Sequence, residues 1–239
     1  MAEVVGLEGR VALVTGSRRG IGRLLTEHLL GRHMTVVGFA RGEASIDHPR
    51  YSHYQVDISD PGEVQEAFAK LAQSSKSLHI LINNAGVATS MHAMMMSPSS
   101  ADAMLRTNLL GSYMVSREAA KLMRKSKWGR IINIGSMAAK LEPVGGSIYA
   151  VTKAGLSTLA NVLAKELATF GITCNTINVT AIETDMLNGL SAEWVRSTLE
   201  LLPLPRLATP DDLFNVVDFL ISERSSYITA QTIGLGGIH

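Results

Sequence analysis

The segment TGSRRGIG, residues 15–22, follows an apolar run of strand length and precedes a stretch with helical periodicity. Each of its glycines suits a turn that connects a strand to a helix beside a bound dinucleotide. Gly16 allows a sharp turn, Gly20 allows the backbone to approach a pyrophosphate, and Gly22 allows the helix to pack close to the strand. The helix N-terminus would offer N–H groups and a positive dipole to the phosphates. With a strand before it and a helix after it, the segment predicts a dinucleotide-binding turn.

The rest of the chain continues this alternation of strand-like and helix-like stretches. Apolar runs rich in Val, Ile or Leu alternate with amphipathic stretches, which predicts a doubly wound α/β fold of the Rossmann type, with helices on both faces of a parallel sheet. The expected strands are Arg10–Thr15, Met34–Ala40, Ser52–Val56, Leu78–Asn83, Arg130–Gly135, Thr173–Asn178 and Thr232–Leu235. The expected helices are Ile21–Gly31, Pro61–Gln73, Pro98–Lys125, Ser147–Phe170, Ala192–Leu201 and Pro210–Ser222. We expect a single domain over residues 1–239, with a cofactor half at about 8–135 and a catalytic and substrate half at about 136–239.

The composition of the chain argues against nucleic-acid binding, membrane association and metal binding. The 239 residues are 46% hydrophobic and 18% charged, as in a globular protein with a substantial core. A formal net charge of +1 gives no reason to expect a nucleic-acid partner. No apolar run reaches the roughly 18 residues that could span a bilayer, so we expect no membrane association and a cytoplasmic location. The single cysteine, Cys174, cannot form an intrachain disulfide, and the histidines lack metal-ligand spacing, so no metal is expected.

Tyr149 and Lys153 are four residues apart on an expected helix, which places both side chains on one face. A free phenol has a pKa of about 10, and a nearby ammonium group would lower it toward the working range. The pair therefore predicts a general acid/base in which Tyr149 is the proton donor or acceptor. The alternative reading of this spacing is a solvated helix face.

Further motifs occur along the chain at defined spacings. They are Thr-Gly-x-x-x-Gly-Ile-Gly at 15–22, Asn83-Asn84-Ala85-Gly86 after the fourth strand, Asn108 in the next helix, Ser136 after the fifth strand, and Tyr149-x-x-x-Lys153. In this order the motifs resemble those of the short-chain dehydrogenase/reductase family, from Arg10 to about Gly237. The resemblance implies hydride transfer between a nicotinamide and a carbonyl carbon. Ser136 would hydrogen-bond the substrate oxygen, and Asn108 would anchor a water that links Lys153 to solvent.

Cofactor preference in this family depends on the end of the second strand, where a carboxylate favours NAD by bonding the ribose hydroxyls. This chain has Ala40 there, followed by Arg41, and Arg19 precedes the second glycine. Both arginines match positions at which relatives that prefer NADP hold the extra phosphate, so we expect NADP(H); the alternative is that one arginine is only a surface residue. Asp57 either contacts the adenine amino group or caps the turn before Pro61.

The resemblance implies a larger set of cofactor-binding residues. Asn83, Ala85 and Gly86 would line the bottom of the cleft, whereas Asn84 could instead tie the fourth strand to its neighbours. The expected cofactor-binding residues are Gly16, Ser17, Arg18, Arg19, Gly20, Ile21, Gly22, Arg41, Asp57, Ile58, Asn84, Ala85, Gly86, Tyr149, Lys153, Ile182 and Thr184. The catalytic set is Tyr149, Lys153, Ser136 and Asn108.

Two stretches depart from the family pattern. Val179 and Thr180 replace the usual Pro-Gly after the sixth strand, and because a β-branched residue resists positive φ, we expect the loop to take another path. The segment Arg41–Gln55 leaves little room for the usual helix between the second and third strands.

The substrate is expected to contact apolar loops at Met91–Met96, Met137–Ser147 and Met186–Leu202. The segments Pro203–Leu207 and Tyr227–Thr232 resemble 3-oxoacyl-[acyl-carrier-protein] reductases and related small carbonyl reductases. We therefore expect reduction of a ketone, such as a 3-oxoacyl thioester, to a secondary alcohol. The alternatives are a secondary-alcohol dehydrogenase working in the oxidative direction, and a non-catalytic NADP-binding regulator. Related enzymes commonly form tetramers, so we expect a homotetramer, with a dimer as the alternative.

Overall fold

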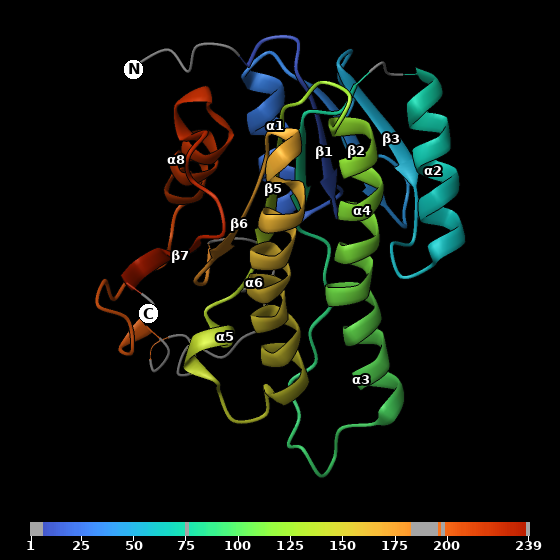
Figure 1. Cartoon of the computed structure of the whole chain (residues 1–239). Helices are drawn as coiled ribbons and strands as arrows, with labels where there is room; N and C mark the ends of the chain where they lie inside the picture. The colour runs from blue at the N-terminus through green and yellow to red at the C-terminus, as the bar shows by residue number, and fades with distance from the viewer. Residues whose placement is uncertain (1–6, 75–76, 183–195, 197–198, 238–239) are drawn as a thin grey trace.

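The computed structural model describes residues 7–74, 77–182, 196 and 199–237. Within these ranges seven strands form one parallel sheet in the order β3-β2-β1-β4-β5-β6-β7 (Figure 1). The strands are β1 (Val11–Thr15), β2 (Thr35–Ala40), β3 (Tyr51–Gln55), β4 (Ile80–Asn83), β5 (Gly129–Ile134), β6 (Ile172–Asn178) and β7 (Thr232–Gly234). The strand order reverses between β1 and β4, and such a reversal opens a crevice at the carboxyl ends of the strands.

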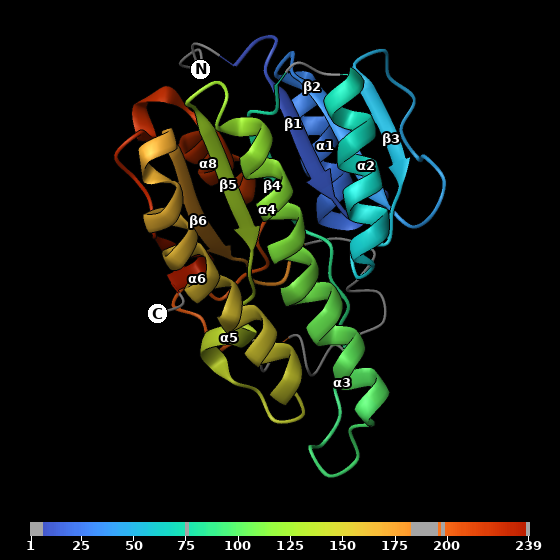
Figure 2. The same cartoon turned by 45° about the vertical axis from the view of Figure 1, so that its right-hand side comes forward.

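Helices cover both faces of the sheet. The helical elements are α1 (Gly20–Gly31), α2 (Pro61–Ser74), α3 (Pro98–Met104), η1 (Leu105–Gly111), α4 (Ser112–Met123), α5 (Ala138–Leu141), α6 (Ser147–Leu167), η2 (Ala168–Phe170), α8 (Pro210–Ile221), η4 (Glu223–Ser225) and η5 (Leu235–Gly237). Figures 1 and 2 show α2, α4 and α6 on one face and α1 and α8 on the other. The helices α3 and α5 and the first turns of α6 extend beyond the carboxyl ends of the strands.

Alternate residues of the central strands build two separate cores. In β1, Ala12 and Val14 pack with Leu25 of α1 in the first core, while Leu13 packs with Val115 of α4 in the second. A strand covered on both faces must be apolar at consecutive positions, which is why these strands read as unbroken apolar runs. The predicted doubly wound fold is confirmed.

Two helix predictions need comment. All of residues 41–50 are described and none of them is helical, so the expected loss of the helix between β2 and β3 is confirmed. The helix predicted over 192–201 lies largely outside the described residues.

Candidate active site

The glycine loop turns out of β1 through two residues with positive φ. Gly16 has φ +68° and Gly20 has φ +54°, conformations that favour glycine over other residues. Helix α1 begins at Gly20, and its cap residue Arg19 makes no side-chain hydrogen bond to the first turn. A Cβ atom at Gly20 would meet no atom within 4 Å, so this side of the loop is open. The N-terminus of α1 therefore has both the free N–H groups and the space that a phosphate group requires.

The side chains around this turn differ in exposure. Ser17 is fully buried, whereas Arg18 and Arg19 are exposed at the start of α1. Ile21 is partly buried and packs on the first core. The two guanidinium groups are thus free to approach an anion outside the loop, while Ser17 faces the protein.

Hydrogen bonds tie the glycine loop to the end of β4. The Thr15 hydroxyl accepts from the N–H groups of Asn84 and Ala85, both at 3.0 Å. The Asn84 side-chain amide donates to Thr15 O at 3.0 Å, so Asn84 does tie β4 to its neighbour, as one of the two readings of the sequence held. We had not singled out Thr15, because its partners lie 69 and 70 residues away in the chain.

Asn83 needs a correction, because we expected it to line the cofactor cleft. Its side chain is buried, and its amide donates to Asn133 Oδ1 at 2.9 Å and to Ser116 Oγ at 2.8 Å. The amide nitrogen therefore links β4 to β5 and α4 beneath the cleft, while the buried Asn83 Oδ1 has no hydrogen-bond partner among the described residues.

At the outer edge of the sheet, Arg41 and Asp57 face each other. Arg41 Nη1 lies 3.9 Å from Asp57 Oδ2, and Asp57 Oδ1 accepts from the N–H of Ser59 at 2.9 Å and from its hydroxyl at 2.7 Å. The capping role considered for Asp57 is thus observed, and its second oxygen remains directed toward Arg41. The neighbouring Ile58 side chain is buried in the second core.

Three of the predicted catalytic residues lie together at the carboxyl ends of β5 and β6. Ser136 follows β5, and Tyr149 and Lys153 project from α6. The Ser136 side chain lies near enough to Tyr149 to lower the pKa of its hydroxyl, and the Ser136 hydroxyl accepts from Ala138 N–H at 3.1 Å. Lys153 Nζ lies 5.9 Å from the centroid of the Tyr149 ring and donates to Ile134 O at 2.8 Å.

Burial governs the protonation of this group. It raises the pKa of Tyr149, and the neighbouring Ser136 side chain acts in the opposite direction. Burial also lowers the pKa of Lys153 to about 8, because its ammonium group is removed from water. Lys153 Nζ donates to Ile134 O and lies 5.9 Å from the centroid of the Tyr149 ring, and burial is the largest influence on the pKa of Tyr149; that Lys153 lowers this pKa stays a prediction.

Asn108 lies in η1, a π-helical turn within the helix that we predicted as continuous from Pro98 to Lys125. It is fully buried; Oδ1 accepts from Val87 N–H at 2.8 Å, and Nδ2 donates to Val87 O at 2.8 Å and to Thr152 Oγ1 at 3.1 Å. A Cβ atom on Gly86 would lie 3.3 Å from Asn108 Oδ1 and 3.6 Å from Lys153 Nζ. Asn108 and Lys153 therefore border the same small space beside Gly86. Single π-helical turns often occur at functional sites.

Comparison with known proteins agrees with this geometry. The family profile described as Enoyl-(Acyl carrier protein) reductase matches residues 16–238. Two proteins named 3-oxoacyl-[acyl-carrier-protein] reductase FabG, from Aquifex aeolicus (strain VF5) and Escherichia coli (strain K12), are 35% and 34% identical to this chain, and both alignments cover 98% of each sequence. The chain belongs to the short-chain dehydrogenase/reductase family. It is an oxidoreductase of the class that acts on CH–OH and ketone groups.

Solved structures support the same assignment. A putative gluconate dehydrogenase from Agrobacterium tumefaciens superposes with a TM-score of 0.89 at 30% identity, covering 98% of this chain and 97% of that one. A short chain dehydrogenase from Leptospira borgpetersenii with bound NAD+ superposes with a TM-score of 0.91 at 27% identity, covering 98% and 94%.

The departure from the family's Pro-Gly pattern has a simple structural outcome. Neither Val179 nor Thr180 adopts positive φ. Val179 is buried in the first core, and its carbonyl accepts from Met137 N–H at 2.8 Å, so the chain here stays beside the segment after β5. Ile182, a predicted cofactor-binding residue, is buried and pairs with Ala208, while Thr184 lies outside the described residues.

The described residues contain no group of three or more His, Cys, Asp or Glu residues arranged to hold a metal ion. Among the same residues, none of the helices is both long and apolar enough to cross a membrane.

Proposed function

We propose that this short-chain dehydrogenase/reductase uses NADP(H) to reduce a ketone, such as a 3-oxoacyl thioester, to a secondary alcohol, with Tyr149 as the general acid. The observation that carries the proposal is the grouping of Tyr149, Ser136 and Lys153 beside an open glycine loop. The names of the relatives at 34% and 35% identity support the 3-oxoacyl class. We further propose that residues 1–239 act as one domain, with cofactor-binding residues at about 8–135 and catalytic and substrate residues at about 136–239.

The residues present fit a nicotinamide dinucleotide. The open face at Gly20 and the uncapped N-terminus of α1 suit its pyrophosphate. Ala40 leaves the end of β2 without a carboxylate, and exposed Arg18, Arg19 and Arg41 surround this region, which favours the 2′-phosphate of NADP(H) over NAD. When bound, the cofactor supplies the hydride that the substrate carbon accepts.

The protein's own residues handle the proton. As the carbonyl oxygen gains negative charge, the Tyr149 hydroxyl donates its proton to that oxygen, and the Ser136 hydroxyl stabilises it by a second hydrogen bond. The raised pKa of Tyr149 keeps the phenol protonated near neutrality, which suits a donor. Lys153 and Asn108 border the space beside Gly86, from which solvent can restore the proton.

The first experiment measures NADPH oxidation with a panel of 3-oxoacyl thioesters and simple ketones, and NADP+ reduction with secondary alcohols. We expect NADPH to be oxidised, and most rapidly with an apolar β-keto compound. Reaction with alcohols alone would favour the oxidative alternative. NADPH binding without turnover on any substrate would overturn the enzyme proposal and leave a cofactor-binding regulator.

The proposed substrate wall includes two apolar loops. Met91 N–H donates to Gly145 O at 2.9 Å, so the Met-rich loop and the α5–α6 loop lie side by side. Met91, Met94 and Val144 are all exposed there. These side chains suit an acyl chain or another uncharged group next to the reacting carbonyl.

The activity should depend on pH through Lys153. Its pKa of about 8 means that the ammonium is charged below that pH and neutral above it. Tyr149, with a raised pKa, stays protonated over the same range. We expect kcat/KM for ketone reduction to fall as the pH rises through about 8, and Lys153→Arg to shift that fall to higher pH because a guanidinium keeps its charge. A profile that stays flat up to pH 10 (about the pKa of a free phenol) would contradict this role.

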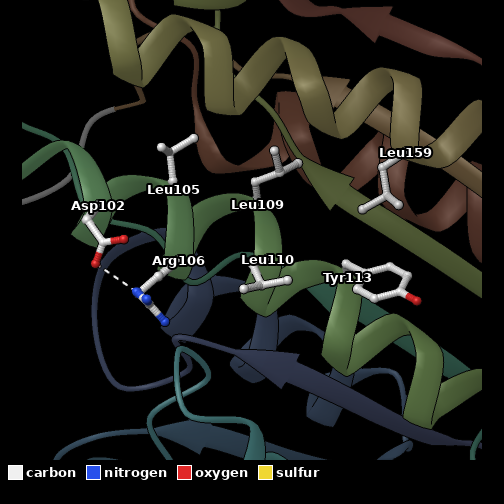
Figure 3. Close-up of a pocket in the computed structure, with 7 residues that line it drawn as sticks. All are labelled: Asp102, Leu105, Arg106, Leu109, Leu110, Tyr113 and Leu159. Carbon is white, nitrogen blue, oxygen red and sulfur yellow. Dashed lines mark hydrogen bonds and ion pairs between the residues drawn. The ribbon is translucent and has the colours of Figure 1, made fainter.

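We also propose that the protein is a homotetramer. Leu105, Leu110 and Tyr113 project from the η1–α4 helix, and with Leu109 and Leu159 they line an apolar hollow of about 430 Å³ (Figure 3). Leu105, Leu110 and Tyr113 are 38%, 42% and 42% exposed in the single chain. Such a face between two long helices suits contact with a second copy.

Replacing Leu110 by glutamate tests this contact. A carboxylate buried without a partner costs several kcal/mol, so we expect Leu110→Glu to form smaller species than the wild type in mass measurements on the intact protein in solution. Met94→Glu is the control, because it adds the same charge to an exposed loop away from the hollow. A wild-type protein that is monomeric at micromolar concentration would rule out the tetramer.

A further inference from the structure

A chain of hydrogen bonds connects the glycine loop to the loop that follows β2. Ser17 Oγ lies 3.0 Å from Tyr51 OH, Tyr51 OH lies 2.9 Å from His53 Nδ1, and His53 Nε2 lies 2.8 Å from Gly42 O. Tyr51 and His53 are both on β3, and their side chains point toward β2. Tyr51 and His53 share a face because they are two residues apart on a strand, but the contact with Ser17 does not follow from spacing, because Ser17 and Tyr51 are 34 residues apart.

Gly38 of β2 makes room for this chain. A Cβ atom there would lie 2.1 Å from Tyr51 OH and 2.3 Å from Ser17 Oγ. Both distances are far below van der Waals contact, so any larger residue would displace the Tyr51 hydroxyl. The absence of a side chain at Gly38 is therefore what allows β3 to reach the glycine loop across β2.

The direction of the hydrogen bonds follows from their last acceptor. Gly42 O can only accept, so His53 Nε2 carries the proton and donates it. In a neutral imidazole, Nδ1 must then accept, and it accepts from the Tyr51 hydroxyl. The Tyr51 oxygen in turn accepts from Ser17. Tyr51 and His53 each have one donor role and one acceptor role, so the chain specifies a single arrangement.

The loop that these hydrogen bonds hold carries Arg41 and contacts Arg18 of the glycine loop, two basic residues of the proposed cofactor site. Gly42 directly follows Arg41, and a Cβ atom on Gly42 would lie 2.9 Å from Arg18 Cζ, so the Arg18 guanidinium lies against Gly42. The Ser45 hydroxyl donates to Arg18 O at 2.6 Å and closes the same contact from the other side. Arg41 and His53 also line one hollow at the sheet edge.

We propose that Tyr51 and His53 are positioning residues that hold Arg41 and Arg18 in place for the 2′-phosphate of the cofactor's adenosine. This inference rests on the proposed use of NADP(H). It adds that selectivity for the phosphorylated cofactor depends on side chains of β3 that touch neither the phosphate nor the reacting atoms. Their hydrogen bonds hold the backbone at Gly42, which directly follows Arg41 and packs against the Arg18 guanidinium.

The test measures binding and does not need turnover. The affinities of 2′,5′-ADP and 5′-AMP are compared by calorimetry in wild type, Tyr51→Phe, His53→Ala and His53→Gln. We expect Tyr51→Phe and His53→Ala to weaken 2′,5′-ADP about fivefold, the equivalent of one neutral hydrogen bond, and to leave 5′-AMP unchanged. His53→Gln, which can still donate and accept, should recover much of the loss. Tyr54→Phe is the control, because Tyr54 lies on the same strand but its hydroxyl faces Ser74.

Replacing both arginines by alanine tests whether Tyr51 acts through the guanidinium groups. If it does, adding Tyr51→Phe to the Arg18→Ala, Arg41→Ala protein should cost little more affinity for 2′,5′-ADP. The two proposals fail in different ways. A wild-type protein that binds both nucleotides equally would overturn NADP(H) use, whereas a wild-type preference that persists in Tyr51→Phe and His53→Ala would overturn only the positioning role. Equal weakening of the binding of both nucleotides in these variants would also overturn the positioning role, because that pattern indicates a general structural defect.

Discussion

Replacing Tyr149 by phenylalanine is expected to lower the rate of ketone reduction by about a thousandfold, within the range found for loss of a general acid. The substitution removes one hydroxyl group, whose pKa the neighbouring Ser136 side chain lowers, and leaves the aromatic ring in its place on α6. Without that hydroxyl, the developing alkoxide has no proton donor. Single-turnover and steady-state NADPH oxidation would both report the loss.

The same variant should bind NADPH almost as tightly as the wild type, because the ring and Lys153 remain. Tyr227→Phe is the matched control, since Tyr227 is 98% exposed and its hydroxyl can be removed without disturbing the site. If Tyr149→Phe kept most of the wild-type rate while Tyr227→Phe behaved normally, another group would have to supply the proton, and the proposed role of Tyr149 would be wrong.

Substituting alanine for Gly22 is expected to have the second large effect, this time on cofactor binding and on stability. A Cβ atom at Gly22 would lie 2.2 Å from Gly16 O and 2.4 Å from Asn84 Nδ2. Because Gly16 O is backbone, α1 would have to move away from β1 to relieve the contact. Overpacking of this kind costs about 1–3 kcal/mol of unfolding free energy. It would also displace the N-terminus of α1, so NADPH affinity should fall about tenfold or more.

Gly31→Ala offers a control in the same helix. A Cβ atom at Gly31 would meet no atom within 4 Å, and alanine favours the helical conformation, so this variant should be as stable as the wild type or more so. Urea denaturation gives the unfolding free energies, and fluorescence titration gives the NADPH affinities. Normal NADPH binding by Gly22→Ala would contradict the proposed use of this turn.

Much of the fold followed from local pattern. Each of the seven strands was predicted to within two residues at either end. The central strands give a distinct signal because a strand buried on both faces needs consecutive apolar residues, whereas the edge strands β3 and β7 are only partly buried. The π-helical turn at η1 could not be predicted in this way. Its residues have ordinary helical periodicity, and the turn shows itself only in the contacts that Asn108 makes with Val87 and Thr152.

The grouping of the proposed catalytic residues was predictable for a similar reason. Tyr149 and Lys153 are one helical turn apart, so the sequence places them on one face whatever surrounds them. Their protonation depends on the surroundings: burial raises the pKa of Tyr149 and lowers that of Lys153, and Lys153 bonds to Ile134 O. The expectation that Lys153 lowers the pKa of Tyr149 used spacing alone, which says nothing about burial.

The sequence by itself determined the doubly wound sheet, the glycine turn and the helix face that carries Tyr149, because each is encoded within a few consecutive residues. Only the tertiary structure decided that the Asn83 side chain is buried and that Tyr51 reaches Ser17 across Gly38. These outcomes depend on which strands become neighbours. Contacts between segments 34 or 50 residues apart leave no periodic trace in a single sequence, since each depends on the packing of the whole sheet.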